Sequence, residues 1–404
     1  MEHLTLPDAT WQTRPGLSEL CDVLGATHGQ TRFVGGAVRD TLLGIEVSDV
    51  DLATRHSPEE VLDRLRGARI KAVPTGLAHG TITAVLADGK PVEITTLRSD
   101  VATDGRHATV AFTDDWREDA ARRDFTINAL YADPVTRELF DYFDGRADLA
   151  SGRVRFIGDP LQRIAEDHLR ILRFFRFHAR FGDVPDAAGL EACAARANDL
   201  MALSRERIAA ELLKLLVAPG AVATLMLMVG RGILLPVLPE IVLTGVEAFA
   251  RVAAGELAAG VDRDPIRRLA AILPRDAKIG EDVAARLKLS TLQRKRIVSA
   301  LLPDVAAPQV LVYRLGRERA LDRWLIAHPA DAERAQFIRD WTAPGFPLGG
   351  GAIVARGVDK GPDVARLLKL VEDQWIAEGF PDADRTNQIA DDAVAQFKRS
   401  TTIA

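Results

Sequence analysis

Residues 33–54 read FVGGAVRDTLLGIEVSDVDLAT. The apolar residues before Gly35 and Gly36 are typical of a strand, and residues 37–43 have the spacing of a helix. Glycine lets backbone N–H groups approach a phosphate, and a helix that starts directly afterwards offers the positive end of its dipole. We therefore expect a phosphate-binding turn at the two glycines, with Arg39 one helical turn later.

The same stretch ends in residues 47–53, which predict a second strand. Residues two apart in a strand share a face, so Asp49 and Asp51 are expected to project together. Two carboxylates on one face repel each other unless a cation neutralises them, and a hydrated Mg²⁺ with substrate phosphates suits this arrangement. A lone pair of this kind would more simply be a solvent-exposed strand face. Combined with the glycine turn, it indicates a site for a nucleoside triphosphate and a metal ion.

A third carboxylate would complete a site for two metal ions. Glu93 is the candidate, because it lies on a β-rich run with Val92 and Ile94 on the opposite face. Asp88-Gly89 before this run is a hairpin turn signal. The alternation is explained equally well by an exposed hairpin strand, so spacing alone leaves both interpretations open.

The chain changes character once along its length. Short strands and helices alternate over roughly the first 145 residues, and from about residue 159 the pattern is helical to the end. Residues 342–351 hold two prolines and four glycines, which is typical of a linker. The expected fold class is α+β, with an N-terminal mixed β-sheet followed by an all-helical remainder.

Composition limits the class of protein. The 404 residues carry 52 Lys+Arg against 57 Asp+Glu, a net charge of −5, which excludes a histone-like polycation. The two cysteines, Cys21 and Cys193, have no metal-ligand spacing, which argues against a disulfide framework and a cysteine-based zinc site. The first residues lack a basic and apolar leader, and no apolar run reaches about 18 residues. We expect a cytoplasmic protein without a membrane segment.

Four further motifs follow the glycine turn in order. Counting the turn together with the Asp-x-Asp pair as the first motif, the second to fifth motifs are RRDFTINAL at residues 122–130, DYFDGRADL at 141–149, EDHLRILRFFRF at 166–177 and ERIAAELLKLL at 206–216. With the turn and the Asp-x-Asp pair, they closely resemble the class II tRNA nucleotidyltransferases (CCA-adding enzymes) and the related bacterial poly(A) polymerases, within the DNA polymerase β-like superfamily. The resemblance covers about residues 30–217.

This resemblance implies an order of domains. It begins with a nucleotidyltransferase catalytic head that holds the mixed sheet, followed by a helical neck that selects the nucleotide, a helical body and a helical, tRNA-binding tail. The expected bounds are residues 1–150, 151–218, 219–340 and 341–404.

The resemblance also implies roles for individual residues. Asp49 and Asp51 would hold the metal ions, taken to be Mg²⁺, and Glu93 would join them as a catalytic carboxylate in activating the RNA 3′-hydroxyl. The turn, the second motif and the fourth motif would bind the nucleotide, with Arg123 placed most directly at the triphosphate. The expected nucleotide-binding residues are Gly35, Gly36, Arg39, Arg122, Arg123, Asp124, Asn128, Asp167, Arg170, Arg173 and Arg176.

The fourth motif suggests how a base is chosen. Asp167 and Arg170 are three apart, so on one helix they would share a face. Asp accepts hydrogen bonds and Arg donates them in a planar fork, so together they can imitate the Watson–Crick edge of a template base. The resemblance implies that this pair selects CTP and ATP without a nucleic-acid template. The alternative is an exposed i,i+3 salt bridge. Arg173 and Arg176 continue the same face and are expected to reach the triphosphate.

The function that follows is addition of C, C and A to the tRNA 3′ end, with tRNA, CTP and ATP as partners and the oligomeric state left open. One alternative is a poly(A) polymerase with the same site. Another is a non-catalytic RNA-binding protein, against which the intact Asp49, Asp51 and Glu93 argue. Trp324, Trp341 and Trp375 would stack on RNA or, more simply, lie in the core.

Overall fold

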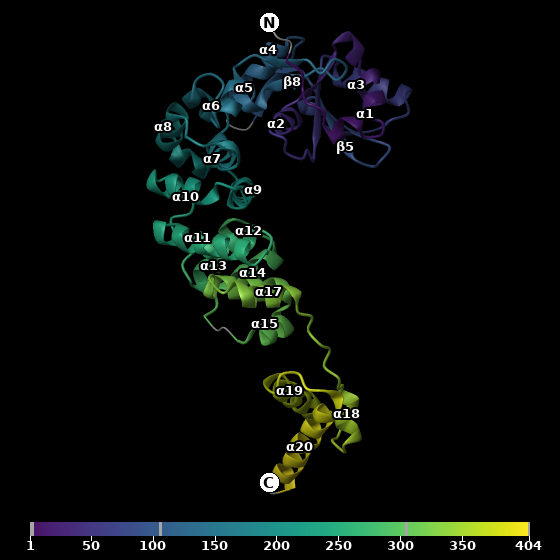
Figure 1. The fold of residues 1–404 in the computed structure, drawn as a ribbon, viewed down its shortest axis with the longest axis vertical. Coiled ribbons are helices and arrows are strands. Elements are labelled where there is room, and N and C mark those ends of the chain that lie inside the picture. The colour runs from purple at the N-terminus through teal and green to yellow at the C-terminus, as the bar shows by residue number, and fades with distance from the viewer. Residues whose placement is uncertain (1–3, 105–106, 304–305, 403–404) are drawn as a thin grey trace. The chain divides into compact units, whose positions relative to one another are not determined.

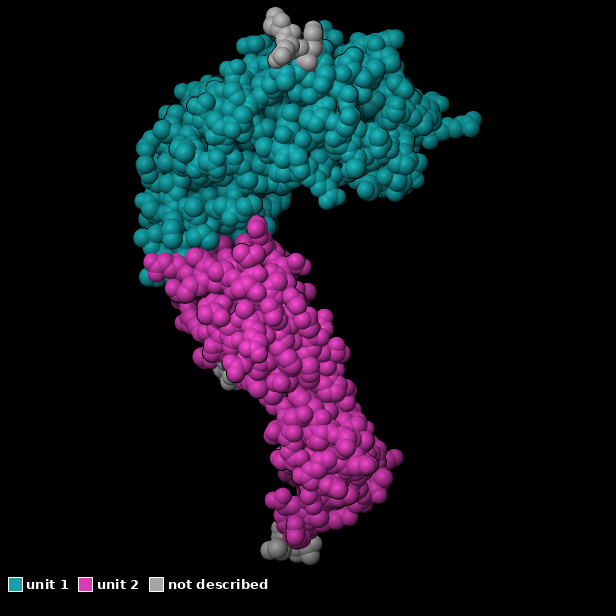
Figure 2. Space-filling view, in the orientation of Figure 1, with its two compact units in different colours: residues 1–246 teal, residues 247–404 magenta. Residues whose placement is uncertain are grey.

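The computed structural model describes residues 4–104, 107–303 and 306–402 (Figure 1). Every named strand lies before residue 142, and the rest of the described chain is built of helices (Figure 1). This confirms the predicted α+β class. The chain divides into two units, residues 1–246 and 247–404 (Figure 2). The four domains named above stay a prediction. Within the described ranges, no helix combines the length and apolar character of a membrane span.

The first unit is organised around a mixed sheet. Its seven strands have the order β3-β4-β5-β2-β1-β8-β9. Neighbouring strands are antiparallel except β2 and β5, which run parallel. The strands are β1 (Thr31–Val34), β2 (Val50–Thr54), β3 (Lys71–Gly76), β4 (Thr81–Val85), β5 (Pro91–Thr96), β8 (Leu130–Ala132) and β9 (Leu139–Asp141), and a separate hairpin joins β6 (Arg98–Asp104) to β7 (His107–Phe112).

The helices of the first unit begin where the sequence offers capping groups. The Ser57 hydroxyl accepts a hydrogen bond from the Glu60 backbone N–H, and the Glu60 carboxylate accepts one from the Ser57 backbone N–H, as the capping-box pattern predicts. The helices are α1 (Leu17–Val23), α2 (Gly36–Leu42), α3 (Pro58–Gly67), α4 (Trp116–Ala121), α5 (Gly145–Ala150), α6 (Pro160–Glu166), α7 (Arg170–Phe181), α8 (Ala187–Ala195), α9 (Arg205–Leu216) and α10 (Ala221–Gly230), with the short 3₁₀ helix η4 (Thr126–Asn128).

Strand β2 begins later than the predicted residues 47–53. The Arg14 guanidinium donates to the carbonyl oxygens of Val47 and Ser48 at 2.9 and 3.2 Å. These two backbone acceptors therefore bond to a side chain, and strand pairing starts only where β2 meets its neighbours β1 and β5. As a result, Asp49 lies one residue before the strand.

An aromatic core fixes α7 against the second motif. The Phe125 ring lies 4.9 Å from Phe156 and 5.3 Å from Phe177, centroid to centroid. Phe174 stacks on Phe156 at 5.5 Å. Phe125, Phe156 and Phe174 are fully buried, so the arginines between the α7 phenylalanines are held at set positions relative to Asp124.

The second unit is helical throughout its described part. A buried ion-pair group joins its helices: Arg296 contacts Asp322 at 2.5 Å and Asp264 at 2.7 Å, and Arg267 contacts Glu256 and Asp322. The helices are α11 (Leu243–Ala258), α12 (Pro265–Ile272), α13 (Ala277–Arg286), α14 (Thr291–Leu301), α15 (Pro308–Leu315), α16 (Arg317–Ala327), α17 (Ala332–Asp340), α18 (Gly350–Ala355), α19 (Pro362–Ala377) and α20 (Ala383–Thr402).

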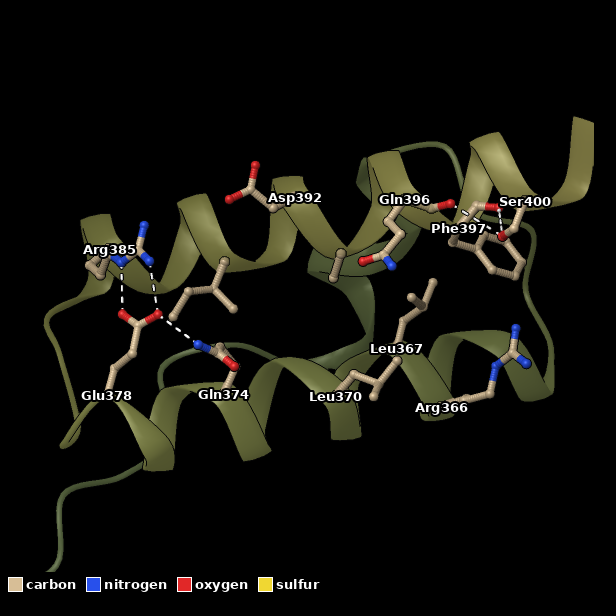
Figure 3. A pocket seen from close by; sticks show the side chains of 12 residues that line it. Arg366, Leu367, Leu370, Gln374, Glu378, Arg385, Asp392, Gln396, Phe397 and Ser400 are labelled. Carbon is tan, nitrogen blue, oxygen red and sulfur yellow. Dashed lines mark hydrogen bonds and ion pairs between the residues drawn. The ribbon is translucent and has the colours of Figure 1, made fainter.

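The last helices carry a small core and a groove. Trp375 is 1% exposed and its ring contacts Tyr313, Phe346 and Phe380, so it lies in the core; Trp324 is also buried. A groove of about 610 Å³ runs between α19 and α20. Figure 3 shows that Glu378 and Arg385 bridge one end of it.

Candidate active site

The predicted carboxylates come together where β2 and β5 run side by side. Asp51 and Glu93 are direct partners in the parallel register. Asp51 is half-buried, whereas Glu93 and Asp49 are exposed. The Asp49 carboxylate accepts a hydrogen bond from the Ser48 hydroxyl at 2.8 Å. The sheet therefore presents Asp51 beside Glu93, with Asp49 two residues upstream.

Electrostatics show that these carboxylates repel each other. Burial, and next the charge of Glu93, raise the pKa of Asp51 to about 6. Asp49 adds to the increase, whereas Arg123 opposes it. A cation would relieve this repulsion, and the oxygen donors are those that Mg²⁺ prefers.

The residues that would hold Mg²⁺ are thus Asp49 and Asp51, with Glu93 adjacent. In the part of the chain that the structure describes, no three His, Cys, Asp or Glu side chains form a ready-made metal cluster. Mg²⁺ sites in enzymes commonly use one or two carboxylates and take their other ligands from water and substrate phosphates. The donor set at β2 fits that pattern.

The glycine turn adopts a backbone that favours glycine. Gly35 has φ +69°, and its N–H donates to the carbonyl of Leu130 at 3.0 Å. A Cβ at this position would lie 3.6 Å from both the Arg123 Nη1 and the Asn128 carbonyl oxygen. The structure therefore brings Gly35, Arg123 and Asn128 side by side, although they are far apart in the sequence.

Arg39 lies in the interior instead of projecting from the turn. It is 6% exposed, and its Nε and Nη2 contact Asp40 at 2.8 and 2.7 Å. Its Nη1 donates to the Asn128 side chain, and its guanidinium lies over the Phe181 ring at 4.2 Å. Burial lowers the pKa of Arg39. These contacts join α2 to η4 and α7, and a role of Arg39 in nucleotide binding stays a prediction.

The two arginines of the second motif share one buried carboxylate. Asp119 on α4 accepts from Arg122 Nε at 2.8 Å and from Arg123 Nη2 at 3.1 Å. The Tyr131 hydroxyl donates to the same carboxylate at 2.6 Å. Asp119 was not among the candidate residues predicted from the sequence. Its i,i+3 and i,i+4 spacing to Arg122 and Arg123 could have indicated a contact on one helix face.

Asp124 and Asn128 form a second chain of polar contacts. Arg173 contacts the Asp124 carboxylate at 2.7 and 2.5 Å, and the Asn128 amide donates to it at 3.0 Å. Burial alone would raise the pKa of Asp124, but the charge of Arg173 and the hydrogen bonds from Asn128 and Arg173 together lower it. Arg176 pairs with Glu211 on α9 at 2.6 Å. The arginines of α7 thus already have carboxylate partners in the protein.

The proposed base-reading pair departs from the predicted geometry. Asp167 lies in a non-helical break after α6, and Arg170 is the first residue of α7. Asp167 accepts from Arg207 on α9 at 3.1 and 2.9 Å, whereas Arg170 contacts Glu166 and the Arg163 carbonyl. The prediction that Asp167 and Arg170 lie on one continuous helix is therefore wrong. The alternative, a salt bridge between Asp167 and Arg170, is wrong as well, because each pairs with a different residue.

Comparison with known proteins places this architecture. Residues 31–155 match the family described as the poly A polymerase head domain, and residues 186–243 match the probable RNA and SrmB-binding site of polymerase A. The chain is 36% identical over 391 residues to the mitochondrial CCA tRNA nucleotidyltransferase 1 of Mus musculus, which is 90% of this chain and 87% of that protein. It is 32% identical over 394 residues to the CCA-adding enzyme of Lactococcus lactis subsp. cremoris, 92% of this chain and 93% of that enzyme.

The fold agrees with these sequence matches. The chain superposes on the crystal structure of the Bacillus stearothermophilus CCA-adding enzyme in complex with CTP with a TM-score of 0.75 and 26% identity. The superposition covers 96% of this chain and 99% of that one. The similarity therefore extends over sheet and helices alike and confirms the resemblance that the ordered motifs indicated. The chain belongs to the family of the CCA-adding enzymes, the tRNA nucleotidyltransferases.

Proposed function

We propose that the protein adds C, C and A to the 3′ end of tRNA from CTP and ATP without a nucleic-acid template. The relatives that match over most of this chain carry that activity in their names. One observation in the structure carries the proposal furthest. Arg123 lies beside the glycine turn at Gly35 and within electrostatic reach of Asp51, which is paired with Glu93. Transfer from a nucleoside triphosphate needs such carboxylates next to a positively charged phosphate site.

In this proposal the RNA 3′-hydroxyl attacks the nucleotide α-phosphate in line, and pyrophosphate leaves. Asp49 and Asp51 would hold Mg²⁺, which would supply Lewis-acid stabilisation of the negative charge that develops in the reaction. Glu93 increases the negative charge beside Asp51 and helps to take up the proton from the 3′-hydroxyl. Arg123 provides positive charge for the triphosphate at the glycine turn.

The neck side chains would choose the base. The Asp167 carboxylate would accept a hydrogen bond from the exocyclic amine that cytosine and adenine share, and Arg170 would donate to the neighbouring ring acceptor. Arg207 holds Asp167 with one nitrogen, Nη2, at 3.1 and 2.9 Å. The carboxylate oxygens keep further acceptor capacity, because each has more than one lone pair. The Arg170 contact at 3.4 Å to the Arg122 carbonyl is its weakest and is the one most easily exchanged for a base.

The match of residues 31–155 to a poly A polymerase head supports a second candidate function, the addition of a 3′ poly(A) tail to RNA. One assay separates the candidates: incubate the protein with tRNA lacking its 3′ end and with CTP and ATP, then sequence the product ends. CCA addition predicts ends of C, CC and CCA that stop after the first A. A poly(A) polymerase would give runs of A of variable length, and a non-catalytic RNA-binding protein would give no extension.

A further inference from the structure

A buried carboxylate without an assigned role lies beside the candidate phosphate-binding turn. Asp119 is 1% exposed and comes from α4, which precedes the second motif. Burial by itself would raise the pKa of Asp119, but Arg123 and Arg122 outweigh it and lower the pKa to about 2. The group is therefore a buried anion at neutral pH. A buried anion is costly unless its partners are well placed, which makes its surroundings informative.

The charges around Asp119 do not cancel. One carboxylate faces two guanidinium groups, with Arg122 Nη2 at 2.7 Å and Arg123 Nη2 at 3.1 Å. The group of three side chains therefore keeps one net positive charge. That charge lies next to the turn at Gly35, where a polyphosphate would be bound.

Three hydrogen bonds close a ring that fixes the Arg123 guanidinium. Arg123 Nε donates to the Tyr131 hydroxyl at 3.1 Å, and this hydroxyl donates to Asp119 Oδ2 at 2.6 Å. Arg123 Nη2 donates to the same Oδ2 at 3.1 Å. An arginine held at two of its three nitrogens loses little rotamer entropy when it binds a ligand, so it acts as a preorganised donor.

The third nitrogen of Arg123 is the one aimed at the site. A Cβ on Gly35 would lie 3.6 Å from Nη1, and the described part of the chain gives this nitrogen no hydrogen-bond acceptor. The same guanidinium is close enough to Asp51 to oppose the increase in its pKa. Nη1 is therefore the Arg123 nitrogen nearest to the glycine turn, and Asp51 lies within electrostatic reach of the same guanidinium.

We propose that Asp119 is a positioning residue for nucleotide binding, which holds the Arg123 guanidinium so that Nη1 points at the Gly35 turn. The inference rests on the proposed function, in which Arg123 binds the triphosphate. It assigns Asp119 an effect on the phosphates and none on the base or ribose.

The test compares two ligands that differ only in phosphate number. The affinities of the full chain for CTP and for CMP are measured by calorimetry in the wild type and in Asp119→Asn. Loss of a charged partner should weaken CTP binding by about ten- to a hundredfold, and CMP binding should change by less than about twofold. Glu118→Gln is the matched control, because Glu118 is an exposed carboxylate on the same helix. Its carboxylate accepts a hydrogen bond from the Thr113 hydroxyl and not from an arginine. This substitution should leave both affinities unchanged.

Arg123→Ala separates the positioning role of Asp119 from the proposed role of Arg123 as a ligand of the triphosphate. If Arg123→Ala loses the CTP preference and a folded Asp119→Asn keeps it, the positioning role is overturned and the proposed function stands. If Arg123→Ala keeps the preference as well, Arg123 is not the triphosphate ligand, and the inference fails together with that part of the proposed function. A wild type that does not prefer CTP to CMP would contradict the proposed nucleotide site itself.

Tyr131→Phe decides the question if Asp119→Asn does not fold. This substitution keeps the Asp119 charge and removes only the hydroxyl that links it to Arg123 Nε. Loss of the two hydrogen bonds of this hydroxyl, while the direct contact between Arg123 Nη2 and Asp119 remains, should weaken CTP binding by about two- to tenfold and leave CMP binding unchanged. An unchanged preference for CTP over CMP in this variant would overturn the proposal.

Discussion

Asp51 on β2 and Glu93 on β5 face each other in a parallel strand register, and the pKa of Asp51 is raised to about 6 by burial and by that neighbour. Two acidic side chains at directly opposed positions destabilise a sheet unless a cation compensates them. Arg123 compensates Asp51 only in part. The pair therefore stores an electrostatic cost in the folded protein that a bound divalent cation would remove.

The first prediction concerns this pair. Asp51→Ala should reduce nucleotide incorporation by at least about a hundredfold, because the carboxylate that would hold the metal ion is lost. tRNA binding, measured by filter retention, should stay close to wild type, since the fold of the helical part is untouched. Glu46→Ala, an exposed carboxylate between α2 and β2, is the matched control and should stay active. Substantial turnover by Asp51→Ala would contradict the metal assignment.

The raised pKa of Asp51 predicts competition between protons and Mg²⁺. Below about pH 6 the carboxyl is protonated and must lose its proton before it can hold a cation, so Mg²⁺ affinity should fall by up to about tenfold per pH unit. Above that pH the affinity should reach a plateau. The check is the Mg²⁺ concentration for half-maximal incorporation at several pH values. A requirement that stays constant through this range would be incompatible with Asp51 as a ligand.

Trp375 should matter for stability and not for RNA stacking. Its ring contacts Tyr313, Phe346 and Phe380 and its Nε1 donates to the Pro381 carbonyl at 2.8 Å. Trp375→Ala should cost about 3–5 kcal/mol of local stability, seen as faster amide hydrogen exchange in α19 and α20.

The control for this prediction lies on the same helix. Leu370→Ala removes a side chain that is 55% exposed and should change exchange very little. Unchanged exchange in Trp375→Ala, together with weaker RNA binding, would instead show that the tryptophan stacks on RNA.

Local sequence pattern was enough to predict the elements around the candidate carboxylates Asp51 and Glu93. The strand before Gly35, the helix after it and the β4–β5 hairpin all follow from periodicity, turn glycines and capping residues, which act over a few residues. The predicted start of β2 was wrong because the guanidinium of Arg14, which is distant in the sequence, donates hydrogen bonds to the carbonyl oxygens of Val47 and Ser48.

Contacts between side chains that are distant in the sequence could not be predicted from the local sequence pattern. The sequence pattern does not distinguish an Arg that projects outward after a glycine turn from one that is buried, as Arg39 is against Asp40 and Asn128. The break between α6 and α7 contains no proline or glycine, and it is stabilised by Asp167, which accepts from the Leu169 N–H at 3.1 Å. That break places Asp167 where α9 can supply Arg207, a contact that no local rule predicts.

Asp167→Ala tests whether protein side chains at the α6–α7 break, and not a nucleic-acid template, choose the base. The measurement is the ratio of kcat/KM for CTP and UTP on a tRNA that ends before the first C, together with a melting curve. Loss of the acceptor for the exocyclic amine should lower this ratio by about ten- to a hundredfold. If Asp167 served only to anchor Arg207, Asp167→Ala and Arg207→Ala would lower stability alike and leave the ratio unchanged. A wild-type ratio in a folded Asp167→Ala protein would show that Asp167 does not select the base.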